Sequence, residues 1–334
     1  MLQSIAFPMI LGFAVFMTGM KMMELALHRS VGRHLDTVLQ RSTATPLHGL
    51  LIGTAATAVL QSSTAVTVMT IGLVNAGLLT FPRTLGIVLG TNIGTCLTTE
   101  LIGMNISRFS WPLLLVSLAL WLVTALLGEI GLLPLRQSAR MSMPQPPAVV
   151  RWLQPLRSTA VILGGFALLL VGMGMMQSVG PAVQSSGLFG AFLTRAEDSV
   201  LWGLAAGVVL SAAVHSSAAV IAIIMGLAAS FAMPVPIGIA VVLGANVGTC
   251  VTAVLASIGG SKSGRFVAWA HVLLNVGGAL LFIPILQQLH VITGWMTASP
   301  AAQIAHAQTI FNIASSLLAL PLCYLPFLQR MQPR

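Results

Sequence analysis

Two short polar clusters interrupt otherwise uncharged stretches of this 334-residue chain. The members of the two clusters are Gln61, Ser62, Ser63 and Thr64 in the first, and His215, Ser216 and Ser217 in the second. A serine hydroxyl can cap the first turn of a helix, where free N–H groups and the positive end of the helix dipole attract anions. Neither cluster contains Lys or Arg. We therefore predict an anion site that is built from neutral donors and holds its ligand loosely enough to release it.

A second pair of motifs combines glycine with small oxygen-bearing side chains. These are "GTNIGT" at residues 90–95 and "GANVGT" at residues 244–249. Glycine permits backbone shapes that weaken a helix, so the motifs predict an unwound turn with exposed carbonyl oxygens. Oxygen donors suit a small hard cation, and we take Na⁺ as the only metal expected. The candidate Na⁺-binding residues are Thr91, Asn92, Thr95, Asn246 and Thr249.

Both kinds of motif belong to an internal repeat. A shift of 154 positions lays residues 49–100 over residues 203–254 with 19 identical positions out of 52. The shift aligns the Ser-Ser pairs with each other and "GTNIGT" with "GANVGT". Interrupted helices at matching positions of two repeats are typical of transporter binding sites. The repetition favours a functional interpretation over isolated polar residues that hold helices together.

The elements that must position these motifs are membrane helices. The chain is 57% hydrophobic and 6% charged, with mean hydropathy +0.97, which predicts an all-α polytopic membrane protein. Seven spans are expected, at residues 5–27, 84–103, 110–128, 159–177, 237–259, 266–286 and 303–328, and those at 84–103 and 237–259 are expected to be broken. Residues 47–79 and 199–231 are predicted to be re-entrant hairpins. Each arm is too short to cross because residues 47–60 reach only about 21 Å as a helix.

Charge placement predicts the topology. With re-entrant hairpins, thirteen of the fifteen Lys and Arg residues fall on one side of the membrane, and only Arg108 and Arg195 fall on the other. The basic side is cytoplasmic by the positive-inside rule. We expect an inverted pair of repeats in the cell membrane, with the linker and C-terminus cytoplasmic and the N-terminus outside. The expected units are repeat 1 at 1–135, a basic linker at 136–157, repeat 2 at 158–286 and a closing helix with a short tail at 287–334.

Several classes of function are not supported by the sequence. It has no phosphate-binding "GxxxxGK[ST]" loop, no paired carboxylates and no "HExxH", so we expect no enzyme and no cofactor. The net charge of +9 is explained by cytoplasmic loops, so we expect no nucleic-acid partner. Glu100 lies inside an expected span and is a candidate for proton coupling. Lys21 and Glu24 are interpreted as an interfacial pair.

The repeated motifs, with "RFVAWAHVLLN" at 265–275 and "IAHAQTIFN" at 304–312, resemble the sodium-dependent inorganic phosphate cotransporter family, type II. The resemblance implies coupled movement of Na⁺ and phosphate, with Gln61, Ser62, Ser63, Thr64, Ser216 and Ser217 at the phosphate. His215 departs from the family's glutamine and, unlike glutamine, changes charge near neutral pH. Ala218 replaces the hydroxyl of Thr64. The chain ends soon after the last expected span, so we expect a bacterial member without a PhoU-like domain.

Three alternatives remain open from the sequence. The same architecture could export phosphate, could use H⁺ as coupling ion through His215 or Glu100, or, as a less favoured choice, could form a passive anion channel. The direction of net transport, the ion stoichiometry and the selectivity between phosphate and arsenate are not determined by the residues. A homodimer is a candidate assembly.

Overall fold

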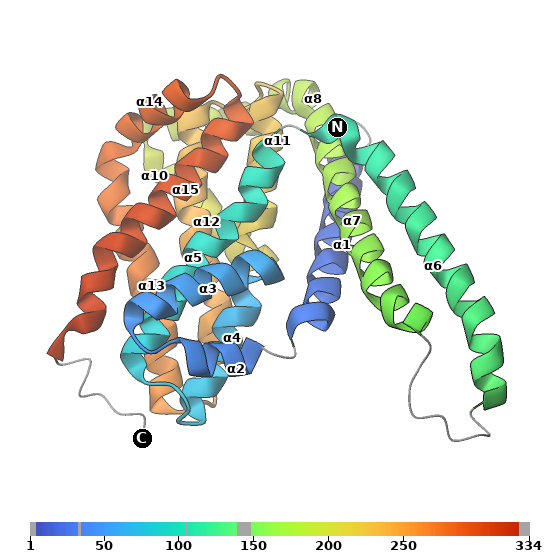
Figure 1. Ribbon diagram of the computed structural model, residues 1–334. Coiled ribbons are helices and arrows are strands. Elements are labelled where there is room, and N and C mark those ends of the chain that lie inside the picture. Colours follow the sequence, from blue (N-terminus) through green and yellow to red (C-terminus); the bar gives the residue numbers. More distant parts are fainter. Residues whose placement is uncertain (1–4, 33–34, 105, 139–147, 327–334) are drawn as a thin grey trace.

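The computed structural model describes residues 5–32, 35–104, 106–138 and 148–326, and these contain helices and turns without a β-strand. Seven helical segments are long and apolar enough to cross a membrane, and each coincides with one of the seven predicted spans (Figure 1). A multi-pass membrane protein is therefore confirmed as the fold class. The segments are Phe7–Val31, Phe81–Gly103, Ser110–Leu127, Trp152–Gln184, Val235–Ala256, Lys262–Met296 and Pro300–Tyr324.

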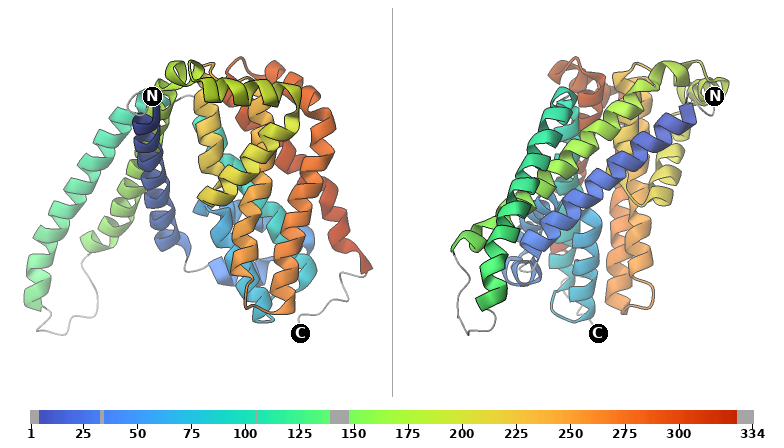
Figure 2. Two further views of the ribbon diagram at one scale, coloured as in Figure 1. Left: turned by 180° about the vertical axis from the view of Figure 1, so that it is seen from behind. Right: turned by 90° about the vertical axis from the view of Figure 1, so that its right-hand side faces the viewer.

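Two pairs of short helices occupy the predicted hairpins. The first pair is α3 (Pro46–Leu60) and α4 (Ser63–Asn75), and the second is α10 (Val200–Val214) and α11 (Ser217–Ala229). No arm exceeds 15 residues, or about 22 Å, so none is long enough to cross the hydrocarbon core. The blue α4 lies toward one end of the bundle and the yellow α10–α11 pair toward the other (Figure 2).

The prediction of broken spans at "GTNIGT" and "GANVGT" is wrong. Helices α5 (Phe81–Gly103) and α12 (Val235–Ala256) run without interruption through both motifs. The glycines instead allow close contact between helices, since a Cβ at Gly90 would lie 2.2 Å from the carbonyl oxygen of Leu50 in α3. A Cβ at Gly244 would lie 2.0 Å from the carbonyl oxygen of Leu204 in α10. Each hairpin is thus packed backbone to backbone against the span that follows it.

The predicted linker is partly helical. Helix α6 covers Ser110–Ser138 and α7 covers Ala148–Ser178, so α7 includes the last ten residues of the predicted linker, with Pro155 among them. The remaining linker residues, 139–147, lie outside the described residues, as do 329–334 of the predicted tail. Shorter helices that the sequence reading did not anticipate are α2 (Leu35–Ser42), α8 (Gly180–Gln184), α9 (Gly187–Asp198) and α14 (Leu286–Met296).

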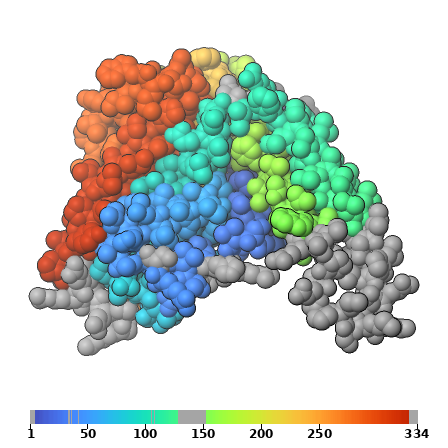
Figure 3. Space-filling view, in the orientation of Figure 1, coloured from blue at the N-terminus to red at the C-terminus, as the bar shows by residue number. Residues whose placement is uncertain are grey.

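The spans form two groups. Helix α1 (Phe7–Val31) packs along α7, and α6 also packs along α7. The second group contains both hairpins with α5, α12, α13 (Lys262–Phe282) and α15 (Pro300–Ala319). In the space-filling view α15 and α6 lie at opposite edges of the molecule (Figure 3). Helices α1, α7 and α11 join the groups, so the polar hairpin tips face α1 across the space between them.

Candidate functional site

The two polar clusters form matching turns. Gln61 ends α3 and His215 ends α10, and both have the left-handed backbone conformation, with φ of 55° and 58°. Such a conformation costs a side-chain-bearing residue about 1–2 kcal/mol. Ser62 and Ser216 are the N-caps of the next helices, and their hydroxyls accept hydrogen bonds from the N–H groups of Ala65 and Ala219, each at 3.3 Å. Strained turns kept at two equivalent positions indicate a functional constraint.

Both turns open into one cavity of about 520 Å³. It therefore receives the N-terminal ends of α4 and α11, whose dipoles favour negative charge. All seven predicted anion-site residues line this cavity: Gln61, Ser62, Ser63, Thr64, His215, Ser216 and Ser217. The volume exceeds that of a small tetrahedral oxyanion, so water or an accompanying ion has room beside it.

The two tips differ in how their first residue is held. The Gln61 amide donates to the carbonyl oxygen of Ala58 at 2.5 Å, and its oxygen accepts from the hydroxyl of Thr98 at 2.5 Å. Thr252 is the repeat equivalent of Thr98, but its hydroxyl donates to the carbonyl oxygen of Thr249 at 2.8 Å. The glutamine tip is therefore tied to α5, whereas the hydroxyl that would tie His215 to α12 bonds within its own helix.

Only some of the predicted Na⁺-binding residues line the cavity. Thr95 and Thr249 line the cavity together with Thr98 and Thr252. Thr91 is buried away from the cavity, and its hydroxyl donates to the carbonyl oxygen of Val88. The pairing of Thr98 with Thr252 across the repeat is a sequence signal that the initial selection of site residues missed.

The two asparagines of these motifs contact other helices rather than the cavity. The amide oxygen of Asn92 lies 3.2 Å from Nε2 of His271, and its amide nitrogen donates to Asn275 at 3.3 Å, both on α13. Asn246 accepts from Asn312 of α15 at 3.4 Å. These contacts join α5 to α13 and α12 to α15, which is how polar side chains commonly hold membrane helices together.

Lys21 and Glu24 lie on the cavity wall, not at an isolated interfacial position. They form an ion pair of 2.9 Å on α1, and Met17 and Met20 of the same helix also line the cavity. The Lys21 side chain is 60% exposed and the Glu24 side chain 19% exposed. Apart from His215, Lys21 and Glu24 are the basic and acidic residues among the described residues that line the cavity. Their i, i+3 spacing predicts an ion pair on α1, but only the fold shows that this pair lies beside the hairpin tips.

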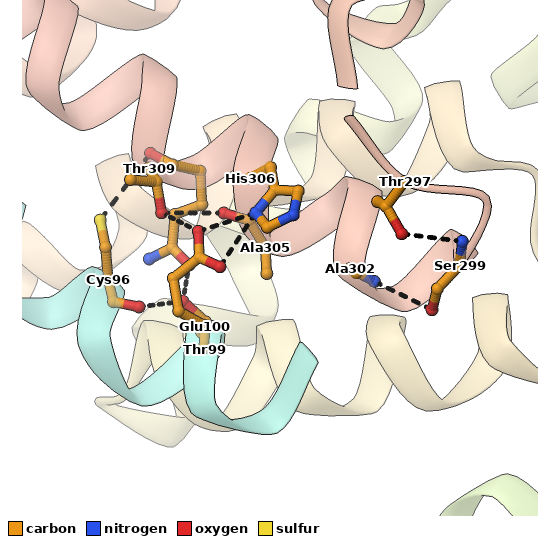
Figure 4. Close-up of polar contacts among 10 residues, drawn as sticks. Cys96, Thr99, Glu100, Thr297, Ser299, Ala302, Ala305, His306 and Thr309 are labelled. Carbon is orange, nitrogen blue, oxygen red and sulfur yellow. Dashed lines mark hydrogen bonds and ion pairs between the residues drawn. The ribbon is translucent and has the colours of Figure 1, made fainter. Parts of the chain in front are cut away.

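Glu100 lies outside the cavity and contacts α15 (Figure 4). Its carboxylate lies 2.9 Å from Nδ1 of His306 and accepts from the hydroxyl of Thr309 at 2.5 Å. Both ionisable side chains are partly exposed, at 28% and 25%. Glu100 is separated from the predicted anion site by the width of α5, because Thr95 and Thr98 occupy the opposite side of that helix.

Comparison with known families settles the class of protein. A sequence model described as Na⁺/Pi-cotransporter matches residues 15–135 and 168–298, which together make up most of the chain. The chain belongs to the Na⁺/Pi-cotransporter family. The matched segments contain both hairpins and every residue of the cavity wall. The family resemblance inferred from the repeated motifs is thereby confirmed.

Two relatives of this Na⁺/Pi-cotransporter family member come from bacteria. "Uncharacterized protein YqeW" of Bacillus subtilis is 33% identical over 323 residues, covering 96% of this chain and 95% of the relative. "Putative inorganic phosphate export protein YjbB" of Escherichia coli K12 is 25% identical over 309 residues, covering 92% of this chain but 52% of the relative. The chain thus spans about half the length of YjbB. No solved structure matches the chain.

The charge on Lys21 gives a first prediction for this member of the family. We expect Lys21→Gln to raise the KM for phosphate about threefold to tenfold with little change in kcat. The reason is that the variant removes one positive charge, partly screened by salt, that attracts the phosphate anion to the cavity. Glu24→Gln should lower KM because it removes the competing carboxylate. Initial rates of phosphate flux over a range of phosphate concentrations measure both. Lys262→Gln, outside the cavity wall, is the control, and an equal effect there would contradict a local role for Lys21.

Proposed function

We propose that this protein is a secondary transporter that moves inorganic phosphate across the membrane with Na⁺ by alternating access. The observation that carries the proposal is the convergence of both hairpin tips, with the starts of α4 and α11, in one cavity. Neutral donors at two helix N-termini stabilise an anion without the tight grip of an arginine clamp. Membership of the Na⁺/Pi-cotransporter family supports phosphate as the substrate and argues against an enzyme.

The proposed topology is a pair of inverted repeats with re-entrant hairpins. It is supported by the short hairpin arms, the matching left-handed turns at Gln61 and His215, and the thirteen-to-two distribution of Lys and Arg. We place the protein in the cell membrane with the linker and C-terminus cytoplasmic and the N-terminus outside. The units remain 1–135, 136–157, 158–286 and 287–334, with α7 as the first span of the second repeat. A homodimer is the proposed assembly.

Na⁺ is the proposed coupling ion, and the protein needs no other cofactor in this proposal. Thr95 and Thr249 are the best-placed candidate ligands because both hydroxyls lie on the cavity wall near the hairpin tips. The Thr95 hydroxyl donates to the carbonyl oxygen of Thr91 at 2.8 Å, which leaves its oxygen lone pairs for a cation. The Thr249 hydroxyl lies 2.9 Å from the carbonyl oxygen of Ala245 and shares a second hydrogen bond of 2.7 Å with Ser211, so Thr95 offers the freer oxygen. Thr91, Asn92 and Asn246 have weaker support because they lie outside the cavity wall.

A flux experiment tests both the substrate and the coupling ion. Purified protein in phosphatidylcholine vesicles should accumulate radiolabelled phosphate when an inward Na⁺ gradient is imposed, and should not respond to a proton gradient alone. Glu100→Gln should retain Na⁺-driven flux because Glu100 faces α15 rather than the cavity. Flux driven only by protons and lost in Glu100→Gln would refute Na⁺ coupling and support H⁺ coupling through this residue.

Phosphate export is the second candidate, and the printed name of YjbB favours it. The same vesicles, loaded with phosphate, distinguish the two directions by the sign of net flux under a physiological Na⁺ gradient. Saturable counterflow supports a carrier in either direction. Linear flux that does not saturate would instead favour the passive channel.

A further inference from the structure

The N-terminal half of α1 and the C-terminal half of α7 lie in backbone contact. Gly12 faces Gly172 and Gly19 faces Gly165, and a Cβ at Gly19 would lie 2.4 Å from the carbonyl oxygen of Gly165. The two helices run antiparallel in this register (Figure 2). The same register places Arg29, in the last turn of α1, level with the first turns of α7.

Beyond the glycines, side chains separate the two helices, and a groove of about 370 Å³ lies between them. Its walls are two matching stripes with the spacing i, i+3, i+4 and i+7, which is one face of each helix. The stripe on α1 is Met22, Leu25, Ala26 and Arg29, and the stripe on α7 is Gln154, Arg157, Ser158 and Val161. Because the helices are antiparallel, Arg29, Gln154 and Arg157 gather at the end of the groove, and Met22 and Val161 lie nearer the glycine crossing.

The polar end of the groove is lined by arginine, and none of the described residues that line the groove is a carboxylate. Among the described residues the ion pairs are Lys21 with Glu24 and His306 with Glu100, so neither groove arginine is paired. The Arg157 guanidinium lies 5.4 Å from the centre of the Trp121 ring of α6, which fixes its position beside the groove. Guanidinium groups hydrogen-bond phosphate, and the apolar part of the groove suits a hydrocarbon chain, so together they fit a phospholipid. Basic pockets between the cytoplasmic ends of membrane helices are known to bind anionic lipid headgroups.

We propose that the α1–α7 groove binds an anionic phospholipid. Arg29 and Arg157 hold the phosphate diester, Gln154 and Ser158 offer further hydrogen bonds, and an acyl chain lies against Met22, Leu25 and Val161. The apolar wall favours a lipid over free phosphate, which would leave that wall without a partner. The opposite side of α1 carries Met17, Met20, Lys21 and Glu24 of the 520 Å³ cavity, so the bound lipid supports a helix that also forms the cavity wall.

Native mass spectrometry of the full chain tests the site without relying on transport. The wild-type protein should bind its first phosphatidylglycerol at least about tenfold more tightly than phosphatidylcholine with the same acyl chains, the order expected for two arginines at the membrane surface. The Arg29→Gln/Arg157→Gln variant should lose this preference. If the double variant does not fold, each single variant should show a severalfold loss.

A matched control separates the groove from general surface charge. Arg41→Gln/Arg195→Gln removes two arginines elsewhere, and Arg195 also lies over a tryptophan ring, that of Trp202, at 5.2 Å. This variant should keep the full preference for phosphatidylglycerol. An equal loss in the control, no preference in the wild type, or displacement of phosphatidylglycerol by millimolar inorganic phosphate would each overturn the lipid site. The last result would assign the two arginines to free phosphate.

Discussion

Replacing Gln61 with glycine is expected to reduce phosphate flux at least about tenfold, the effect of losing roughly one charge-assisted or two neutral hydrogen bonds. Glycine adopts the left-handed conformation of this turn without strain, so the variant removes the side chain and leaves the backbone unstrained. The lost side chain is the one that joins the first hairpin tip to Thr98 on α5. Initial rates of radiolabelled phosphate flux in proteoliposomes provide the measurement.

The control for this variant lies at the equivalent position of the second repeat. His215→Gln keeps a hydrogen-bonding side chain at a left-handed turn and should retain most of the flux. Gln61→Ala is a second test of the side chain alone, because alanine keeps the backbone strain of about 1–2 kcal/mol that glutamine already bears at this turn, whereas glycine relieves it. A folded Gln61→Gly protein with wild-type flux would show that the glutamine does not take part in the anion site.

The spans and hairpins could be predicted from the sequence because lipid imposes simple rules on length and composition. A helix must be about 20 residues long to cross the membrane, and the arms of the two hairpins are visibly shorter. The repeat then predicted both hairpins together, with a serine of each Ser-Ser pair as the N-cap of the second arm, and in the structure these N-caps are Ser62 and Ser216. Short helices such as α9 and α14 were missed because, at 12 and 11 residues, they are too short to be distinguished from loops.

The site could be predicted only in part because its two halves are brought together by packing. Residues on the hairpin tips share a repeated motif, whereas Lys21 and Glu24 belong to α1 and share no motif with them. Their position depends on how α1 crosses α7 and contacts α11, and no local pattern encodes that geometry. Polar residues of one helix were likewise assigned to one site, although Thr95 lines the cavity whereas Asn92, one turn earlier in α5, contacts α13.

The glycines of "GTNIGT" and "GANVGT" were misread because glycine has two separate effects in a helix. Glycine weakens a helix, and the prediction of a break rested on this effect alone. Glycine also lacks the Cβ that would keep two helices apart, so it allows close helix packing. The structure shows the second effect at Gly90, Gly94, Gly244 and Gly248, where each missing Cβ would contact backbone of the preceding hairpin within 2.6 Å. The glycines that suggested a break in α5 and α12 therefore allow these uninterrupted helices to pack closely against the hairpins.

Gly244→Ala and Gly90→Ala are therefore expected to destabilise the protein by about 1–3 kcal/mol or more, the usual effect of overpacking against groups that cannot move aside. The nearest atoms to the added methyl groups are the carbonyl oxygens of Leu204 and Leu50, at 2.0 Å and 2.2 Å, which belong to helical backbone. The hairpin would have to move away from α12 or α5, and the tip would move with it. Thermal unfolding in detergent, followed by circular dichroism, measures the loss of stability.

Gly277→Ala is the matched control because Gly277 lies inside α13 and a Cβ there meets no atom within 4 Å. Alanine favours a helix by about 0.5–1 kcal/mol relative to glycine, so this variant should be as stable as the wild type or slightly more stable. The two explanations of the glycine motifs thus predict opposite signs. If the glycines served an unwound turn, Gly244→Ala would be stabilising, as Gly277→Ala is, and only flux would fall. If they serve close packing, stability and flux fall together, because the position of each hairpin tip depends on the contact between its hairpin and the following span.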